Sequence, residues 1–148
     1  MAKPSTSPGD YSASTQLTVD GVVVTDLSAL TDRQHLWLFA KRPGMYIGRA
    51  TLRGVTAFLD GYHYAADRYG GAGLSGFGDW LMSNYTVGAN LTWWAKIEQI
   101  ALPDQDFLTD LTPEQETHVL AVLFDLLDRF LIERDSETSR IEFNYAQS

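Results

Sequence analysis

The glycine-rich segment from Gly71 to Gly76 comes closest to a cofactor-binding motif. It reads Gly-Ala-Gly-Leu-Ser-Gly and matches the Gly-x-Gly-x-x-Gly pattern of dinucleotide-binding proteins. That pattern holds a pyrophosphate only where a β-strand delivers the glycine loop to the N-terminus of a helix. Here the preceding residues are predicted to be helical, and no acidic residue at the tip of a second parallel strand follows. We therefore expect a flexible interhelical linker and no bound dinucleotide.

The titratable side chains form no other reaction centre. Asp125 and Asp128 are three residues apart on the outer face of the last predicted helix, whereas a retaining-type hydrolase needs two carboxylates from separate elements around a pocket. No two of His35, His63 and His118 are four residues apart, as zinc ligands on one helix are. The absence of Cys excludes a thiolate nucleophile and a Cys-based zinc site. We predict a non-enzymatic protein that binds no cofactor or metal.

The segment from Lys41 to Gly48 reads Lys-Arg-Pro-Gly-Met-Tyr-Ile-Gly and is the most distinctive in the chain. It resembles the Arg-Pro-Gly-Met-Tyr-Ile-Gly segment near the start of the ATPase domain of DNA gyrase B subunits. In that family the following helix carries a catalytic Glu and an Asn that binds the metal ion, and Asp-x-Gly-x-Gly loops bind the nucleotide. The helix expected around Gly54 to Tyr62 has neither residue, and no such loop follows. The resemblance therefore carries over no ATPase residue.

A longer resemblance runs from about Leu36 to Phe130. After the Arg-Pro-Gly-Met-Tyr-Ile-Gly segment come an Ala-Phe-Leu-x-Gly-Tyr helix core at Ala57 to Tyr62, a Phe-x-x-Trp-Leu element at Phe77 to Leu81, and a Trp-containing helix at Trp93 to Ile100. This order is similar to that of small uncharacterised bacterial proteins, some of which resemble immunity partners of bacterial toxins. The resemblance implies stoichiometric neutralisation of a toxin and supplies no functional residues.

Elementary stereochemistry gives the same distinctive segment a structural role. Pro43 fixes its own φ and Gly44 permits a positive φ, so we expect Met45 to Ile47 to form an extended apolar strip beneath the next helix. Four cations surround it: Lys41, Arg42, Arg49 and Arg53. They could form an anion site or pair with the acidic C-terminal helix, and we favour pairing within the chain or between subunits.

Negative charge is concentrated in the last third of the chain. The net charge is −8, from 19 acidic and 11 basic residues. The residues before Asp104 carry equal numbers of acidic and basic side chains, so the whole excess follows it. Such a surface repels phosphate backbones and anionic lipids, which excludes nucleic acid and membrane as expected partners. A basic protein is the expected partner.

Aromatic residues add candidates for an interface. Adjacent Trp93 and Trp94 lie on different helix faces, so at least one should leave the core and could anchor a partner. The predicted partner-binding residues are Trp93, Trp94, Asp125, Asp128, Glu133 and Asp135. The predicted function is an immunity-type inhibitor that neutralises a basic bacterial toxin. Alternatives are a homodimer built on the Trp-bearing helix, or a small-molecule pocket or cryptic enzyme lined by Tyr46, Tyr62, Tyr64, Trp80 and Trp93.

These residues are expected on an α+β, predominantly helical fold with about five helices around one core. Asp20-Gly21 between β-branched runs predicts a hairpin over Leu17 to Thr25, and Ile141, Phe143 and Tyr145 alternate like a strand that could join it. Helix signals predict a helix over Asp32 to Lys41 after a Thr31–Gln34 capping box, and another from Thr51 to Tyr69. They also predict a short helix at Phe77, a helix capped by Asn90 that ends at Pro103, and one from Thr112 to about Arg134. Gly54 and Gly61 inside the second of these helices imply close approach of another element. We expect the last helix to be the most buried.

The expected organisation is a flexible tail over residues 1–16 and a single globular domain over residues 17–148. The tail lacks the apolar centre of a signal peptide, and no apolar run approaches the roughly 20 residues of a membrane span. The absence of Cys fits a reducing compartment. A cytoplasmic location is therefore the expectation.

Overall fold

A computed structural model describes residues 17–106 and 110–145. The predicted tail, residues 1–16, lies outside the described residues. The chain divides into two compact units, with the boundary between Leu30 and Thr31, and each unit is considered by itself.

The first unit contains the predicted β-hairpin. Strand β1 (Thr18–Val19) pairs antiparallel with β2 (Val22–Val23), so that Thr18 lies opposite Val23. Asp20 and Gly21 both have positive φ, at 51° and 76°, as the type I′ turn between twisted strands requires. A short 3₁₀ helix, η1 (Leu27–Ala29), follows. The hydroxyl and backbone N–H of Ser28 donate to the Asp26 carboxylate and lower its pKa.

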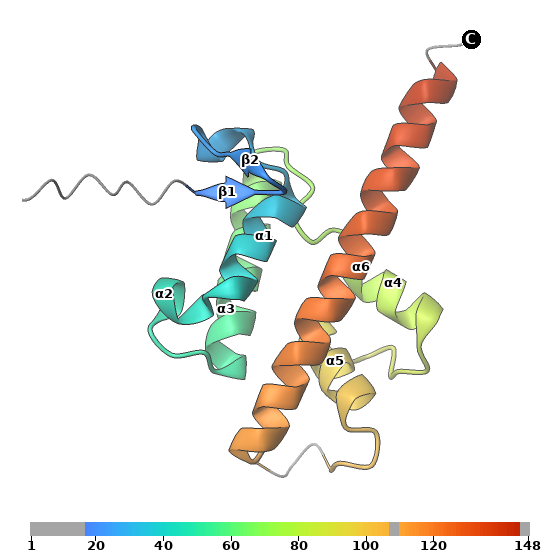
Figure 1. The fold of residues 1–148 in the computed structure, drawn as a ribbon. Helices are drawn as coiled ribbons and strands as arrows, with labels where there is room; N and C mark the ends of the chain where they lie inside the picture. The colour runs from blue at the N-terminus through green and yellow to red at the C-terminus, as the bar shows by residue number, and fades with distance from the viewer. Residues whose placement is uncertain (1–16, 107–109, 146–148) are drawn as a thin grey trace, which may run out of the picture. The chain divides into compact units, whose positions relative to one another are not determined.

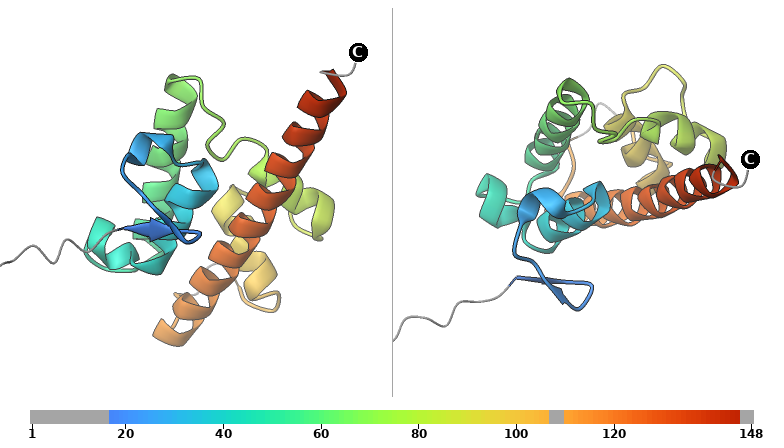
Figure 2. Two further views of the ribbon diagram at one scale, coloured as in Figure 1. Left: turned by 45° about the horizontal axis from the view of Figure 1, so that its top comes forward. Right: turned by 90° about the horizontal axis from the view of Figure 1, so that it is seen from above.

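The second unit is a helical bundle built along one long helix (Figure 1). Its elements are α1 (Asp32–Lys41), α2 (Pro43–Ile47), α3 (Leu52–Arg68), α4 (Phe77–Asn84), α5 (Trp93–Ala101) and α6 (Pro113–Tyr145). Helices α1, α3, α4 and α5 all contact α6, and the two further views in Figure 2 show them gathered along it. The predicted α+β, predominantly helical class is confirmed. The described residues contain one more helix than expected, the short α2.

Capping side chains explain where the helices begin. The Thr31 hydroxyl accepts the Gln34 N–H while the Gln34 side chain accepts the Thr31 N–H, which confirms the predicted capping box of α1. Thr112 and Gln115 form the same pair of bonds at the start of α6. The prediction that Asn90 caps the next helix is wrong, because Thr92 accepts the Ala95 N–H instead. Both residue types cap helices well, so the sequence could not separate them.

The hydrophobic core lies around the middle of α6, as predicted for the most buried helix. Seven of its residues between positions 119 and 131 are buried: Val119, Leu120, Leu123, Leu126, Leu127, Phe130 and Leu131. They pack against Leu36 and Phe39 of α1, Val55 and Leu59 of α3, Phe77 and Leu81 of α4, and Ile97 of α5. One helix therefore holds four others in place, and a disturbance of α6 is expected to disturb them all.

The C-terminal strand predicted at Ile141 and the helix end predicted near Arg134 are both wrong. Helix α6 continues through residue 145, because no Gly or Pro follows Pro113 in the chain to stop it. Hydroxyl groups that favour turns elsewhere are accommodated here, since Ser136, Thr138 and Ser139 each donate to the carbonyl oxygen four residues earlier.

The expected extended strip at Met45 to Ile47 is also wrong. Pro43 occupies the first position of helix α2, where its missing N–H costs nothing, and Gly48 rather than Gly44 takes a positive φ, 81°. Met45 is 75% exposed and Tyr46 is 52% exposed, whereas Ile47 packs against the core. The half-exposed Tyr46 ring meets the buried Phe39 ring and the partly buried Phe58 ring edge to face.

The two glycines inside α3 differ in their surroundings. A methyl group on Gly54 would lie 2.9 Å from the Thr51 hydroxyl oxygen and 3.1 Å from Ile47 Cδ1, which confirms the close approach predicted there. The same prediction for Gly61 is wrong, since a methyl group there would meet nothing within 4 Å.

Replacing Gly61 with Ala should therefore raise the free energy of unfolding by about 0.5–1 kcal/mol, because the unfolded chain loses conformational freedom. Urea denaturation measures this directly, and a lower midpoint would contradict it.

Candidate functional site

A shallow apolar groove lies between α1 and α6. Its α1 wall consists of Arg33, Leu36, Trp37 and Ala40, and its α6 wall of Phe124, Asp125, Leu127, Asp128 and Leu131. The α1 positions, and the α6 positions from Phe124 to Leu131, include steps of three and four residues that place side chains on one helix face. The groove therefore follows from two amphipathic faces that meet without filling the space between them.

Ion pairs border the groove. The Arg33 guanidinium binds the Asp128 carboxylate, with 2.7 Å from Nε to Oδ1 and 3.4 Å from Nη2 to Oδ2, and thereby links α1 to α6. Asp125 pairs with Arg129 within α6 at 3.0 Å. The Lys41 ammonium lies 4.1 Å from the centre of the Trp37 ring. An apolar floor with charged groups at its edge is the composition of a protein-binding surface.

The size of the groove limits what it can hold. Its volume is about 240 Å³, below the roughly 300–1,000 Å³ of typical small-molecule pockets. It suits a single apolar side chain from another protein better than a whole metabolite.

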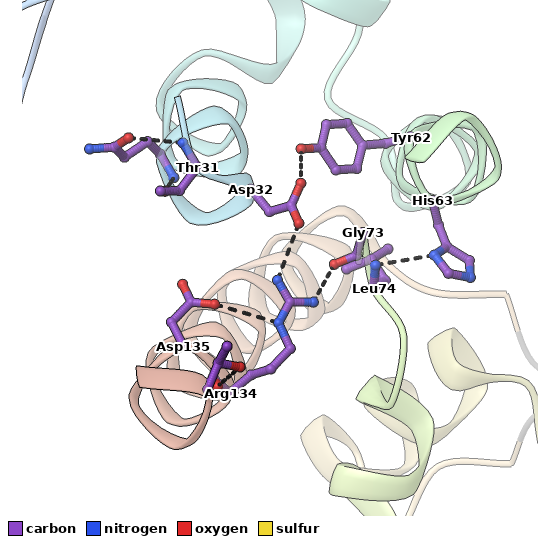
Figure 3. Close-up of polar contacts among 10 residues, drawn as sticks. Thr31, Asp32, Tyr62, His63, Gly73, Leu74, Arg134 and Asp135 are labelled. Atoms are coloured by element: carbon purple, nitrogen blue, oxygen red, sulfur yellow. Dashed lines mark hydrogen bonds and ion pairs between the residues drawn. The ribbon is translucent and has the colours of Figure 1, made fainter. Parts of the chain in front are cut away.

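A second polar cluster links α1, α3, α6 and the glycine segment (Figure 3). The Asp32 carboxylate accepts the Tyr62 hydroxyl at 2.5 Å and Arg134 Nη2 at 3.2 Å. Arg134 Nη1 donates to the Gly73 carbonyl at 2.7 Å, and Arg134 Nε lies 3.6 Å from Asp135. We call Asp32, Tyr62, Gly73 and Arg134 the Arg134 network. Its charged pair is largely shielded from water, with side chains 24% and 19% exposed for Asp32 and Arg134.

The chemistry of this network is that of a structural clamp. Burial raises the pKa of the Tyr62 phenol, and its hydrogen bond to Asp32 and the negative charge there raise it further. The phenol therefore stays protonated as a donor across the ordinary pH range. His63 Nδ1 accepts the Leu74 N–H at 3.1 Å, which ties the glycine segment to α3 as well. The segment from Gly71 to Gly76 is thus the interhelical linker that was predicted, and it is held by two helices.

The structure does not bring all the predicted partner-binding residues together at one site. Asp125 and Asp128 come together at the groove. Trp80 Nε1 donates to Glu133, and Trp93 Nε1 donates to Asp60 at 2.7 Å. Trp94 is 39% exposed whereas Trp93 packs against the core, which confirms that the two indoles diverge.

The basic residues expected to meet the acidic helix do not do so within the described chain. In these ranges no ion pair joins Lys41, Arg42, Arg49 or Arg53 to a carboxylate, and the α6 acids pair with Arg33, Arg129 and Arg134 instead. Arg42 Nη1 contacts the Met45 sulfur at 3.9 Å. The prediction of pairing inside the chain is therefore wrong for these four cations, because they lie near α2 and not near the acidic end of α6.

None of the five aromatic residues proposed to line a small-molecule pocket lines the groove. Tyr64 is 70% exposed, and Tyr62 belongs to the Arg134 network. Trp80 stacks with Phe77, and Trp93 meets the same ring at a tilt. In the part of the chain that the structure describes, no group of three or more His, Asp or Glu could hold a metal ion. Nor does any described helix combine the length and apolar character that crossing a membrane requires.

Sequence reasoning missed most of the residues that build the groove and the network. Tyr62 and Arg134 lie 30 and 102 positions from Asp32, and no local pattern signals such contacts. Trp37, which lines the groove, was not among the predicted site residues. Lys96 was missed too: it is only 5% exposed, and its ammonium donates to the Leu91 carbonyl.

Comparison with known proteins gives no family for this chain. No family model, curated protein or solved structure matches it. The site must therefore be interpreted from its own geometry.

Proposed function

We propose that this protein is a non-enzymatic binding domain, of the immunity type, that neutralises a basic protein toxin through α6 and the groove beside it. The groove carries the proposal: it has the size of one side chain, an apolar floor, and two carboxylates at its edge. A buried anchor residue surrounded by charged groups is the usual arrangement of an energetically important interface contact.

Charge supports the same proposal. Eleven acidic and only three basic residues follow Pro103, and most of these acidic residues lie on α6. The Asp125 side chain remains 58% exposed despite its ion pair. An exposed acidic surface accelerates the encounter with a basic partner and disfavours acidic ones. The lack of Cys fits the reducing cytoplasm, which we propose as its location.

Filling the groove tests the proposal. Ala40 lines it, so Ala40→Trp should weaken the complex with the partner at least tenfold, since about 1.4 kcal/mol corresponds to tenfold in affinity. Ala65→Trp is the matched control, because Ala65 is exposed on α3 and no residue of α3 lines the groove. The partner to use is the product of the neighbouring reading frame, co-expressed and co-purified, with relief of its toxicity as the second readout.

Three results would contradict the proposal. The first two are a wild-type chain that forms no complex and one that relieves no toxicity. The third is an equal effect of both Trp variants on binding, which would show that filling the groove is not what weakens the complex.

A further inference from the structure

A basic patch with exposed apolar side chains surrounds α2. It consists of Lys41, Arg42, Arg49 and Arg53, together with Met45 and Tyr46, and all six are exposed. No acidic residue occurs between Arg33 and Leu59, in a chain that has 19 of them. Glu116 reaches this region from α6, but its carboxylate accepts the Leu52 N–H at 3.2 Å, at the start of α3. The patch therefore lacks a carboxylate counterpart within the described residues.

The opposite surface occurs on the same molecule. We define the acidic arm as residues 132–142 of α6, beyond the last buried position, Leu131. Ile132 and Ile141 are 44% and 56% exposed, and Glu137 and Glu142 form no ion pair within the described ranges. The arm thus presents carboxylates and apolar side chains together, as the basic patch presents cations with Met45 and Tyr46.

The two surfaces cannot meet within one bundle. In all three views of Figures 1 and 2, α2 lies at one end of the second unit and the C-terminal end of α6 lies at the other. A contact between them must therefore join two copies of the chain.

We propose that the basic patch of one copy binds the acidic arm of another, head to tail. The two surfaces carry opposite charges, and each also has apolar side chains that are exposed to water in a single copy. Because the contact uses different surfaces on the two copies, each bound copy still offers a free patch and a free arm. The assembly therefore grows with concentration or closes into a ring, unlike a two-fold dimer.

Sedimentation velocity of the purified chain alone tests the proposal and needs no toxin partner. At low ionic strength the weight-average mass should rise above that of one chain as concentration increases. At about 1 M salt the association should weaken at least tenfold, because the screening length falls to about 3 Å. A mass of one chain at every concentration in low salt would overturn the proposal.

Charge reversal locates the contact. The patch variant carries Arg49→Glu and Arg53→Glu, and the arm variant carries Glu137→Lys and Glu142→Lys; all four positions are exposed. Each variant alone should stay monomeric, an equimolar mixture of the two should associate again, and a chain with all four changes should associate by itself. Unfolding midpoints close to that of the wild type establish that each variant is folded.

Net charge provides the control. The chain with four changes keeps the net charge of −8, whereas the arm variant is less negative and the patch variant more negative. General repulsion between copies would make the arm variant associate more strongly than the wild type, and the proposed contact makes it associate less. Association that persists in both the patch variant and the arm variant also overturns the proposal. A dimer built on the Trp-bearing helix would give that result. Either result leaves toxin binding through the groove untouched.

Discussion

Replacing Arg134 with Met should lower the free energy of unfolding by about 2–3 kcal/mol. The substitution keeps an unbranched apolar stem but removes the guanidinium group, which donates to Gly73 and Asp32 and lies 5.5 Å from the centre of the Phe130 ring. The Gly73 carbonyl then lacks the Arg134 donor. The shielded Asp32 carboxylate still accepts the hydrogen bond from Tyr62, but no cation neutralises its charge. Leaving a partly buried charge uncompensated costs more than a surface ion pair contributes.

Urea denaturation followed by circular dichroism measures the change. Arg140→Met is the matched control, because Arg140 is exposed on the same helix and should change the midpoint by no more than about 0.5 kcal/mol. A double-mutant cycle with Asp32→Asn should give a coupling energy of at least about 1 kcal/mol. Equal midpoints for the two Met variants would show that the Arg134 network does not hold α6 to the other helices.

Local signals predicted the fold where a single side chain decides the outcome. Thr31 with Gln34 and Thr112 with Pro113 fixed the starts of α1 and α6, and Asp20-Gly21 fixed the hairpin turn. Prediction failed where the deciding factor was the absence of a signal. Nothing after Pro113 stops a helix, and the alternation of three apolar residues that suggests a strand is too short a pattern to outweigh helix continuation.

The candidate site was predictable only in part, for a different reason. Asp125 and Asp128 were selected for their charge, and the structure does place them at the groove. The groove itself depends on the distance between two helix faces, and a sequence specifies each face but not the gap that remains between them. Arg134 illustrates the same limit, since its importance comes from three elements that meet around it.

The glycine segment yields the second large effect. Gly73 is buried with φ at 52°, and a methyl group there would lie 2.8 Å from His63 Nδ1 and 3.0 Å from Ala66 Cβ. Gly73→Ala should therefore lower the free energy of unfolding by about 2–4 kcal/mol, because a left-handed backbone is unfavourable for Ala and the contacts are too short to accommodate it. The displaced His63 ring would also lose the hydrogen bond from Leu74.

The opposite sign expected for Gly61→Ala makes the comparison decisive. Both substitutions add one methyl group and reduce the freedom of the unfolded chain equally, so their difference measures the native environment alone. Thermal and urea denaturation of the two variants should therefore separate them by about 2.5–5 kcal/mol in total. If Gly73→Ala were as stable as the wild type, the segment would be a loose connection, and its Gly-x-Gly spacing would need an explanation other than close packing against α3. If it is destabilised as expected, the central glycine of a sequence that looks like a dinucleotide motif is required because the chain passes too close to His63 and Ala66 for any side chain there.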